Sequence, residues 1–276
     1  MKKIIAAIDA SSFSEKKLIS FMDCADWAES NFFLAILDND THIPVAHTFE
    51  GIGYVNYSGV DLNVLQEKEK VRTEKVERFI EACHIHGLSA SILLGRAITT
   101  EELISEARFA DLVLIDSSIS ISPMAGYDPT GRLEQLLHDG ACPVLLLRDG
   151  ALDIEELIFT YNGSASSVYA IKQFTQLFPN LSDKLVTVLF VAENGAISIP
   201  EHDKIMSYLQ YHYSKIGIRI LKGNPSFEIT AFLRNKKTAL VTFGAYGRSS
   251  LSRFFHPSEA DHTLKTLKLP VFITHT

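Results

Sequence analysis

The sequence carries one pattern of apolar and polar segments twice, and this duplication restricts the possible folds more than any other feature of the chain. Asp9, at the end of the first apolar segment, aligns with Asn162 at an offset of 153 residues. Near the end of each copy, Pro143 aligns with Pro270 at an offset of only 127 residues. The second copy therefore lacks about 26 residues, and we assign the loss to the counterpart of residues 42–62.

Each copy alternates short, continuous apolar runs with stretches that are apolar at every third or fourth position. Continuous apolar runs are typical of strands in a parallel sheet that is covered on both faces, and the second pattern is typical of amphipathic helices. Their alternation predicts a doubly wound α/β fold in each copy. We therefore predict two tandem domains, a first repeat of residues 1–150 and a second repeat of residues 151–276.

Four helices are predicted from their apolar stripes, which we expect to face the core. A capping box formed by Ser12 and Glu15 predicts the start of the first helix. The stripes are Leu18, Phe21, Met22, Ala25 and Ala28, then Val76, Phe79, Ile80 and Cys83, in the first repeat, and Val168, Ile171, Phe174 and Phe178, then Ile205, Leu209, Tyr213 and Ile216, in the second.

Charge is distributed unevenly between the repeats. The chain has a net charge of −7, but the first repeat has 13 Lys and Arg against 23 Asp and Glu, a net of −10, and the second has 13 against 10, a net of +3. Nucleic-acid binders normally carry a basic surface, so we expect no nucleic-acid partner. An anionic ligand is favoured in the second repeat.

The sequence gives no sign of a membrane segment, a disulfide framework or a metal site. Its apolar runs are shorter than the roughly 18 to 20 residues that a membrane crossing requires, and Asp9 interrupts the apolar start of the chain. We therefore expect a cytoplasmic protein with no membrane partner. The three cysteines are odd in number and widely spaced, which indicates buried thiols. They are Cys24, Cys83 and Cys142. His84 and His86 do not share a helical face, so we predict a helix terminus there and no metal ligands.

A glycine-containing loop follows the predicted buried strand at 240–243. Gly244 and Gly247 are separated by two residues, and nine residues later Pro257 and Ser258 open a predicted helix. Glycines allow the backbone to turn tightly and approach a ligand, and a helix start offers free N–H groups to phosphate oxygens. The loop is therefore a candidate phosphate site, in which Arg248 supplies a positive charge.

With these features the chain resembles the tandem universal stress proteins over nearly all of both repeats. The family's hallmark is Gly-x-x-Gly, nine residues, then Gly-Ser or Gly-Thr, after the fourth strand of a five-stranded, adenine-nucleotide alpha hydrolase-like domain. The resemblance includes the polar cluster after the first strand, Gly223 and Pro225 before a helix, and the Pro-Val start of the last strand. It implies that Asn162 takes the place of an adenine-contacting acid. The implied site for an adenine nucleotide such as ATP, with Mg²⁺ accompanying it, is Asn162, Gly163, Val191, Gly244, Gly247, Arg248 and Ser258.

Both repeats depart from the hallmark. In the second repeat, Pro257 replaces a glycine and removes one N–H donor, so the loop is either a working phosphate site or a remnant kept for folding. In the first repeat, Asp116 and Ile119 replace the two glycines, and a carboxylate is expected to face the phosphates. We therefore predict no ATP binding in the first repeat.

The resemblance implies a stress-response or signalling protein in which the nucleotide is a regulatory ligand. Two alternatives remain: an interaction or dimerisation module that binds no nucleotide, and a slow ATP hydrolase. The sequence has no Gly-x-Ser-x-Gly elbow, Walker A motif or kinase signature, so we predict no catalytic residues. Single-domain members of the family commonly pair through their last strands. Here that contact is expected within one chain, between residues 143–147 and 270–274, and a further homodimer stays open.

Overall fold

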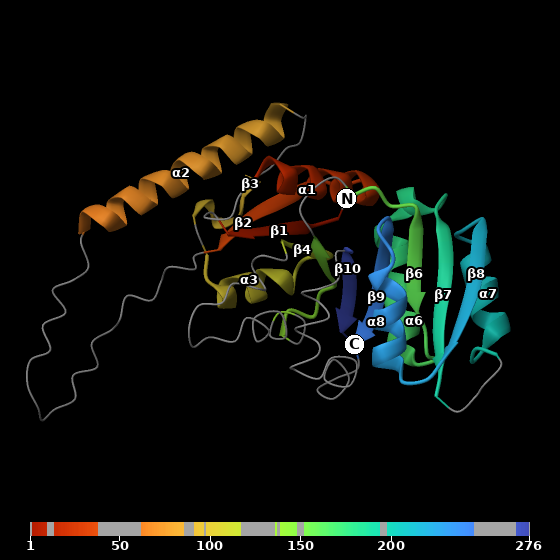
Figure 1. Cartoon of the computed structure of the whole chain (residues 1–276). Helices are drawn as coiled ribbons and strands as arrows, with labels where there is room; N and C mark the ends of the chain where they lie inside the picture. Colours follow the sequence, from red (N-terminus) through yellow and green to blue (C-terminus); the bar gives the residue numbers. More distant parts are fainter. Residues whose placement is uncertain are drawn as a thin grey trace, which may run out of the picture.

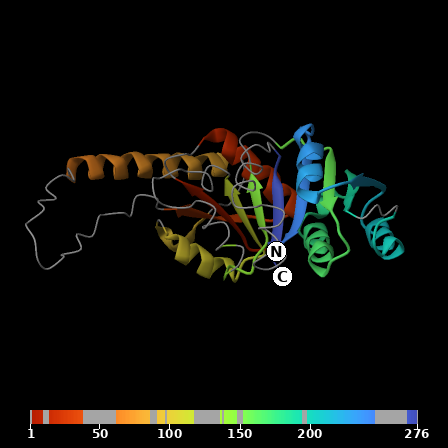
Figure 2. The same cartoon turned by 60° about the horizontal axis from the view of Figure 1, so that its bottom comes forward.

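The computed structural model describes residues 2–9, 14–37, 62–85, 91–96, 98–116, 136, 139–147, 152–193, 198–245 and 269–275. Within these residues the strands form one ten-stranded sheet with helices on both faces (Figures 1 and 2). The strands are β1 (Ile4–Asp9), β2 (Phe32–Leu37), β3 (Ser91–Ile92), β4 (Leu112–Asp116), β5 (Val144–Leu147), β6 (Glu156–Thr160), β7 (Leu185–Ala192), β8 (Lys215–Lys222), β9 (Ala239–Ala245) and β10 (Val271–His275). The helices are α1 (Glu15–Ala28), α2 (Leu62–Ile85), α3 (Thr100–Ala107), α6 (Ala165–Leu177), α7 (His202–Gln210) and α8 (Pro225–Arg234), with short 3₁₀ helices η2 (Leu93–Gly95) and η3 (Pro179–Leu181).

The two halves of the sheet have the same internal strand order. The full order is β3-β2-β1-β4-β5-β10-β9-β6-β7-β8, so the first strand of each repeat lies at the centre of its half. All neighbours are parallel except β5 and β10, which run antiparallel with Leu146 opposite Val271 and Val144 opposite Ile273. This arrangement is the predicted doubly wound α/β fold, and the expected pairing of the two last strands is confirmed.

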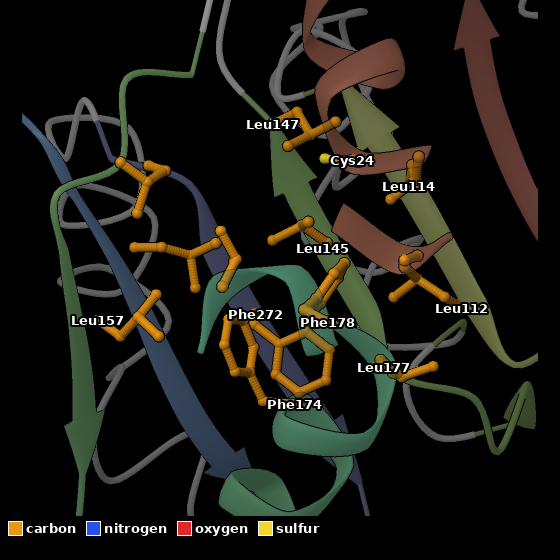
Figure 3. Close-up of a cluster of buried hydrophobic side chains, with 14 of the residues drawn as sticks. Cys24, Leu112, Leu114, Leu145, Leu147, Leu157, Phe174, Leu177, Phe178 and Phe272 are labelled. Carbon is orange, nitrogen blue, oxygen red and sulfur yellow. The ribbon is translucent and has the colours of Figure 1, made fainter. Parts of the chain in front are cut away.

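Two apolar layers cover the sheet. One layer contains the buried faces of α1, α6 and α7, and the other contains those of α3 and α8. In the first layer, Phe174 and Phe178 of the second repeat share one cluster with Leu145 and Leu147 of the first, and Figure 3 shows Leu145 between the two phenylalanines and Leu147. The Phe174 ring meets that of Phe272 edge-on, with 5.3 Å between the ring centroids. The stripes predicted for α1 and α6 are therefore core-facing, as expected.

Polar contacts and a further aromatic contact join the repeats away from the sheet. The Lys2 ammonium donates to the carbonyl oxygens of Ala28, the last residue of α1, at 3.0 Å and of Leu177, the last residue of α6, at 2.8 Å. Unpaired carbonyls at a helix C-terminus attract cations, so one ammonium stabilises two helix ends. Beside it, the Trp27 and Phe178 rings meet edge-on at a centroid distance of 6.4 Å.

Some predicted helix boundaries were wrong. Helix α1 begins at Glu15 with Ser14 as its N-cap, and the Ser14 carbonyl accepts the first helical N–H groups; Ser12, predicted to start the capping box, lies outside the described residues. Helix α7 ends at Gln210, which leaves Tyr213 in a turn and places Ile216 on β8, although both contribute to the core. The apolar spacing of three or four residues continued past the end of α7, through Tyr213 and Ile216, because the segment after the helix faces the same core.

The length difference between the repeats lies partly in a helix. Helix α2 has 24 residues and its counterpart α7 has nine, so the extra residues of the first repeat are not confined to the segment before α2. Val76 is buried and Ile80 is half-buried on α2, as predicted; the side chains of Phe79 and Cys83 lie outside the described residues, as does His86. No helix among the described residues is both long enough and apolar enough to span a bilayer.

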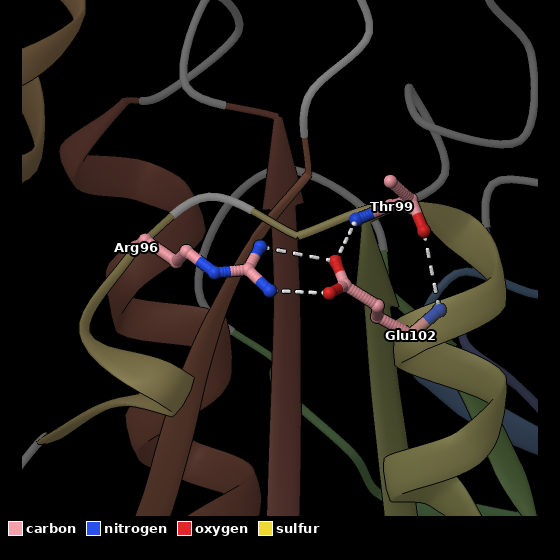
Figure 4. Close-up of polar contacts among 3 residues, drawn as sticks. All are labelled: Arg96, Thr99 and Glu102. Atoms are coloured by element: carbon pink, nitrogen blue, oxygen red, sulfur yellow. Dashed lines mark hydrogen bonds and ion pairs between the residues drawn. The ribbon is translucent and has the colours of Figure 1, made fainter.

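Helix α3 begins with a complete capping box. The Thr99 hydroxyl accepts from the Glu102 N–H at 3.2 Å, and the Glu102 carboxylate accepts from the Thr99 N–H at 2.9 Å (Figure 4). The same carboxylate accepts hydrogen bonds from both terminal guanidinium nitrogens of Arg96, Nη1 and Nη2. The backbone N–H groups of Thr99 and Glu102 thereby have hydrogen-bond acceptors, and Arg96 holds the start of α3 against the end of η2.

Candidate functional site

The strand order of the second repeat defines where a ligand is expected. The chain passes outward from β6 through β7 to β8 and then returns to β9 on the other side of β6, so the order reverses between β6 and β9. Ligands of doubly wound folds bind beyond the carboxyl ends of the strands at such a point. Asn162 and Gly163 follow β6, Gly244 is the penultimate residue of β9, and Val191 is the penultimate residue of β7.

Four of the predicted site residues therefore lie at one edge of the sheet, on three adjacent strands. Asn162 is exposed, and Gly163, Val191 and Gly244 are half-buried. Gly247, Arg248 and Ser258 lie outside the described residues.

The turn after β6 is held by its own side chains. The Asn162 side-chain carbonyl accepts from the Ser164 N–H at 3.1 Å, and the Ser164 hydroxyl accepts from the Ser167 N–H at 3.2 Å as the N-cap of α6. Gly163 has a φ of 80°, a conformation that side chains rarely adopt. Asn162 thus uses its carbonyl within the turn and has no recorded partner, among the described residues, for its NH₂ donors.

Pro200 and Tyr161 close one side of this turn, and the sequence reasoning missed both. A Cβ on Gly163 would lie 2.6 Å from the Cβ of Pro200. The Tyr161 hydroxyl donates to the Pro200 carbonyl oxygen at 3.0 Å, and burial raises the pKa of Tyr161. The segment after β7 is therefore fixed against the turn after β6. No local pattern marks this contact, because it joins residues 39 positions apart.

Gly244 has a packing role that the sequence did not reveal. A Cβ at this position would lie 2.2 Å from the Ser166 carbonyl oxygen and 2.7 Å from the Ser167 backbone nitrogen. The first turn of α6 rests directly on the end of β9, and every residue larger than glycine would force the helix away. This requirement exists whether or not the following loop contacts a phosphate.

Three buried hydroxyls lie where the first turn of α6 meets β9 and β10. Ser166, Thr242 and Thr274 are each at most 1% exposed, and their hydroxyl oxygens have no hydrogen-bond partner among the described residues. Thr242 precedes Gly244 by two residues on the face covered by α6, and Thr274 lies directly opposite Gly244 in the register of β9 with β10. The carboxyl end of the second repeat therefore holds polar groups where an apolar core would be expected.

The first repeat fills the equivalent position with an ion pair. Asp116 ends β4 and lies opposite Leu147, just as Gly244 lies opposite Thr274. Its carboxylate is 2.9 Å from the Lys17 ammonium, and both side chains are more than 90% buried. The expectation that this carboxylate faces a phosphate was therefore wrong: it turns into the protein toward α1. Lys17 was missed, although its position four residues before Phe21 puts a lysine in phase with the apolar stripe.

The described residues offer no metal centre. They contain no group of three or more His, Cys, Asp or Glu side chains arranged to hold an ion. Cys24 and Cys142 are buried and unpaired, as predicted, and burial raises the pKa of Cys142 to about 12.

No family model and no curated protein matches the sequence. Solved structures do match. A universal stress protein from Archaeoglobus fulgidus DSM 4304 superposes with a TM-score of 0.66 at 17% identity, over 99% of this chain and 96% of that one. A putative universal stress protein from Pseudomonas aeruginosa UCBPP-PA14 gives a TM-score of 0.54 at 12% identity, over 100% and 93% of the two chains. A protein of unknown function from Pseudomonas aeruginosa PAO1 gives 0.54 at 12%, over 100% and 92%.

These similarities define the class of fold. At such low identity they show that the chain has the α/β fold of the universal stress proteins, and ligand chemistry has to be argued from the residues of this chain.

Proposed function

We propose that this protein is a stress-response or signalling protein of the universal stress type that binds an adenine nucleotide at the carboxyl edge of its second repeat. The nucleotide is a regulatory ligand, and no side chain of the site acts as a nucleophile or general base.

The main support is the contrast between the two repeats at equivalent positions. In the first repeat, the end of the fourth strand is closed by the buried pair of Lys17 and Asp116. In the second, Gly244 occupies that position, and Asn162 and Val191 at the neighbouring strand ends are reached by solvent. The second repeat also carries the net positive charge, which favours an anionic ligand.

Each candidate residue has a separate part in binding. The free NH₂ donors of Asn162 contact the base, and Val191 supplies an apolar surface beside it. Gly247, Arg248 and Ser258 bind the phosphates through backbone N–H groups, a guanidinium and a hydroxyl. Mg²⁺, when it accompanies the nucleotide, neutralises part of the phosphate charge.

A thermal-shift titration with ATP and Mg²⁺ tests the proposal. At a concentration about 100-fold above its dissociation constant, a ligand that binds only the folded state adds about 2.7 kcal/mol of stability. We expect this shift for the wild-type protein and its loss in Gly247→Val. Gly217→Val is the matched control: glycine there lies on β8, and an added Cβ would meet only the Val186 carbonyl oxygen, at 3.9 Å. That variant should keep the shift.

Three results would contradict the proposal. No shift in the wild type would favour the interaction module without a nucleotide. A shift that survives Gly247→Val would move the site elsewhere. Release of ADP that disappears in Ser258→Ala would identify a slow hydrolase instead of a regulatory site. Gly244→Ala is unsuitable as a test, because it would displace α6 and change stability by itself.

A further inference from the structure

Among the described residues, β8 is a long edge strand. It pairs with β7 at all eight of its positions, from Lys215 opposite Leu185 to Lys222 opposite Ala192, and it ends the strand order of the sheet. Figure 1 shows it at the outer end of the second repeat, beside α7. A strand with one neighbour leaves the N–H and C=O groups of every second residue unpaired along its free edge.

The opposite edge of the sheet is built differently. There the described residues show a β3 of two residues and, further along the chain, one isolated bridge between Leu37 and Ile98. A short edge strand is one of the usual ways in which proteins prevent further strands from adding to a sheet. The first repeat uses it, and the second repeat does not.

Three of the eight residues of β8 are cationic. Lys215, Arg219 and Lys222 are exposed, the strand has no acidic residue, and the described part of the chain shows no ion-pair partner for these three side chains. Residues 215 and 219 lie on one face of the strand and residue 222 on the other, so both faces of the edge carry positive charge. Glu228 packs against Gly223, one residue beyond the strand end.

Apolar side chains lie between these charges. Ile216 and Ile220 are half-buried against the core, whereas Ile218 is 36% exposed. A strand added beside β8 would therefore meet an apolar row on one face and cations on both.

A second copy of the chain fits this edge poorly. Directly opposite residues of an antiparallel pair share one face of the sheet, so two β8 strands centred on Arg219 would put that residue opposite itself, and two centred on Ile218 would place the Arg219 side chains diagonally across the seam. Like charges directly opposite one another destabilise a strand pair. Each of these pairs also brings six cations and no carboxylate of β8 to one seam, so the charge pattern favours an acidic strand over a second copy.

We propose that β8 is a docking edge for an extended acidic segment of another protein, which adds to the sheet as a further strand. Backbone hydrogen bonds along the free edge supply affinity, and carboxylates opposite Lys215 and Arg219 on one face, alternating with apolar residues beside Ile218 on the other, supply specificity.

Peptide binding tests this edge directly. The probe is a labelled peptide of the length of β8 that alternates Glu and Val, and its partner probe alternates Lys and Val. We expect the acidic peptide to bind at low salt roughly tenfold more tightly than the basic one, and to weaken in about 0.3 M salt. The double variant Lys215→Glu/Arg219→Glu should lose the binding. Arg234→Glu/Lys237→Glu, which changes the net charge equally at exposed positions outside β8, should keep it.

Backbone methylation separates strand addition from simple charge attraction. In an extended peptide the N–H groups of the Glu residues line one edge and those of the Val residues line the other. One peptide is N-methylated at every Glu and one at every Val. We expect one of them to lose binding and the other to keep it; any other pattern overturns the proposal. Equal binding to both charge-reversed variants, or self-association of the wild type that Lys215→Glu/Arg219→Glu abolishes, would also overturn it.

Discussion

The buried hydroxyls of Ser166, Thr242 and Thr274 have no hydrogen-bond partner in the described part of the chain, and Thr274 is the one whose cost is most simply measured. An unsatisfied buried hydroxyl costs stability, and valine has nearly the same shape without the polar atom. We expect Thr274→Val to raise the free energy of unfolding by about 1 kcal/mol, as measured by urea denaturation.

Thr175 provides the matched control for that substitution. It is also buried, but its hydroxyl donates to the Ile171 carbonyl oxygen at 2.8 Å and lies 3.1 Å from the Tyr213 hydroxyl. Thr175→Val should therefore lower the free energy of unfolding by about 1 kcal/mol. Destabilisation by Thr274→Val would mean that its hydroxyl bonds to a water or ligand in solution.

The sequence located single residues well where a strand end determines their place, and poorly where a distant partner does. The resemblance assigned Asn162, Val191 and Gly244 to strand ends, and they lie together because parallel strands end at one edge of the sheet. The pairing of Asp116 with Lys17 joins residues 99 positions apart, and the contact of Pro200 with Gly163 depends on how a loop packs. Neither leaves a local pattern.

At the scale of an element, the start of α3 predicts a dependence of stability on pH. Arg96 and the Thr99 N–H bind the Glu102 carboxylate and lower its pKa from 4.5 to about 2. Because the folded pKa lies below the unfolded one, the ionised carboxylate stabilises the fold fully above about pH 4.5, and this contribution disappears as the pH falls to about 2.

Glu102→Gln removes the charge and keeps a side chain that can still cap the helix. We expect the variant to be less stable than the wild type at pH 7, with the difference shrinking steadily between pH 4.5 and 2 in urea denaturation. Glu101→Gln is the control, because it removes a charge from the same helix turn at a residue without an ion pair in the described chain. A difference for Glu102→Gln that stays constant down to pH 2 would contradict the role of the charge.

Helix and strand identity was readable from local periodicity, whereas helix ends were not. The stripes of α1 and α6 lie on the covered side of the sheet because a helix in this fold has only one side facing a core. The ends of α1 and α7 differed from expectation because Ser14 receives the first helical N–H groups of α1, and because the core continues past Gln210 into β8.

At the scale of the whole molecule, the two repeats should unfold as one cooperative unit. The antiparallel pairing of β5 with β10 makes the sheet continuous, and a single apolar layer contains residues of both repeats. Trp27, the only tryptophan, belongs to the first repeat and contacts Phe178 of the second, so its fluorescence reports unfolding of the first repeat and its boundary.

Leu209→Ala tests this coupling from a distance. Leu209 is fully buried on α7, in the outer part of the second repeat, and its truncation should cost about 2–5 kcal/mol. If the repeats are coupled, the urea midpoint reported by Trp27 falls as far as the midpoint reported by far-UV circular dichroism, and the two transitions coincide. If the Trp27 midpoint stays at its wild-type value while the circular dichroism splits into two steps, the continuous sheet does not make the repeats one folding unit.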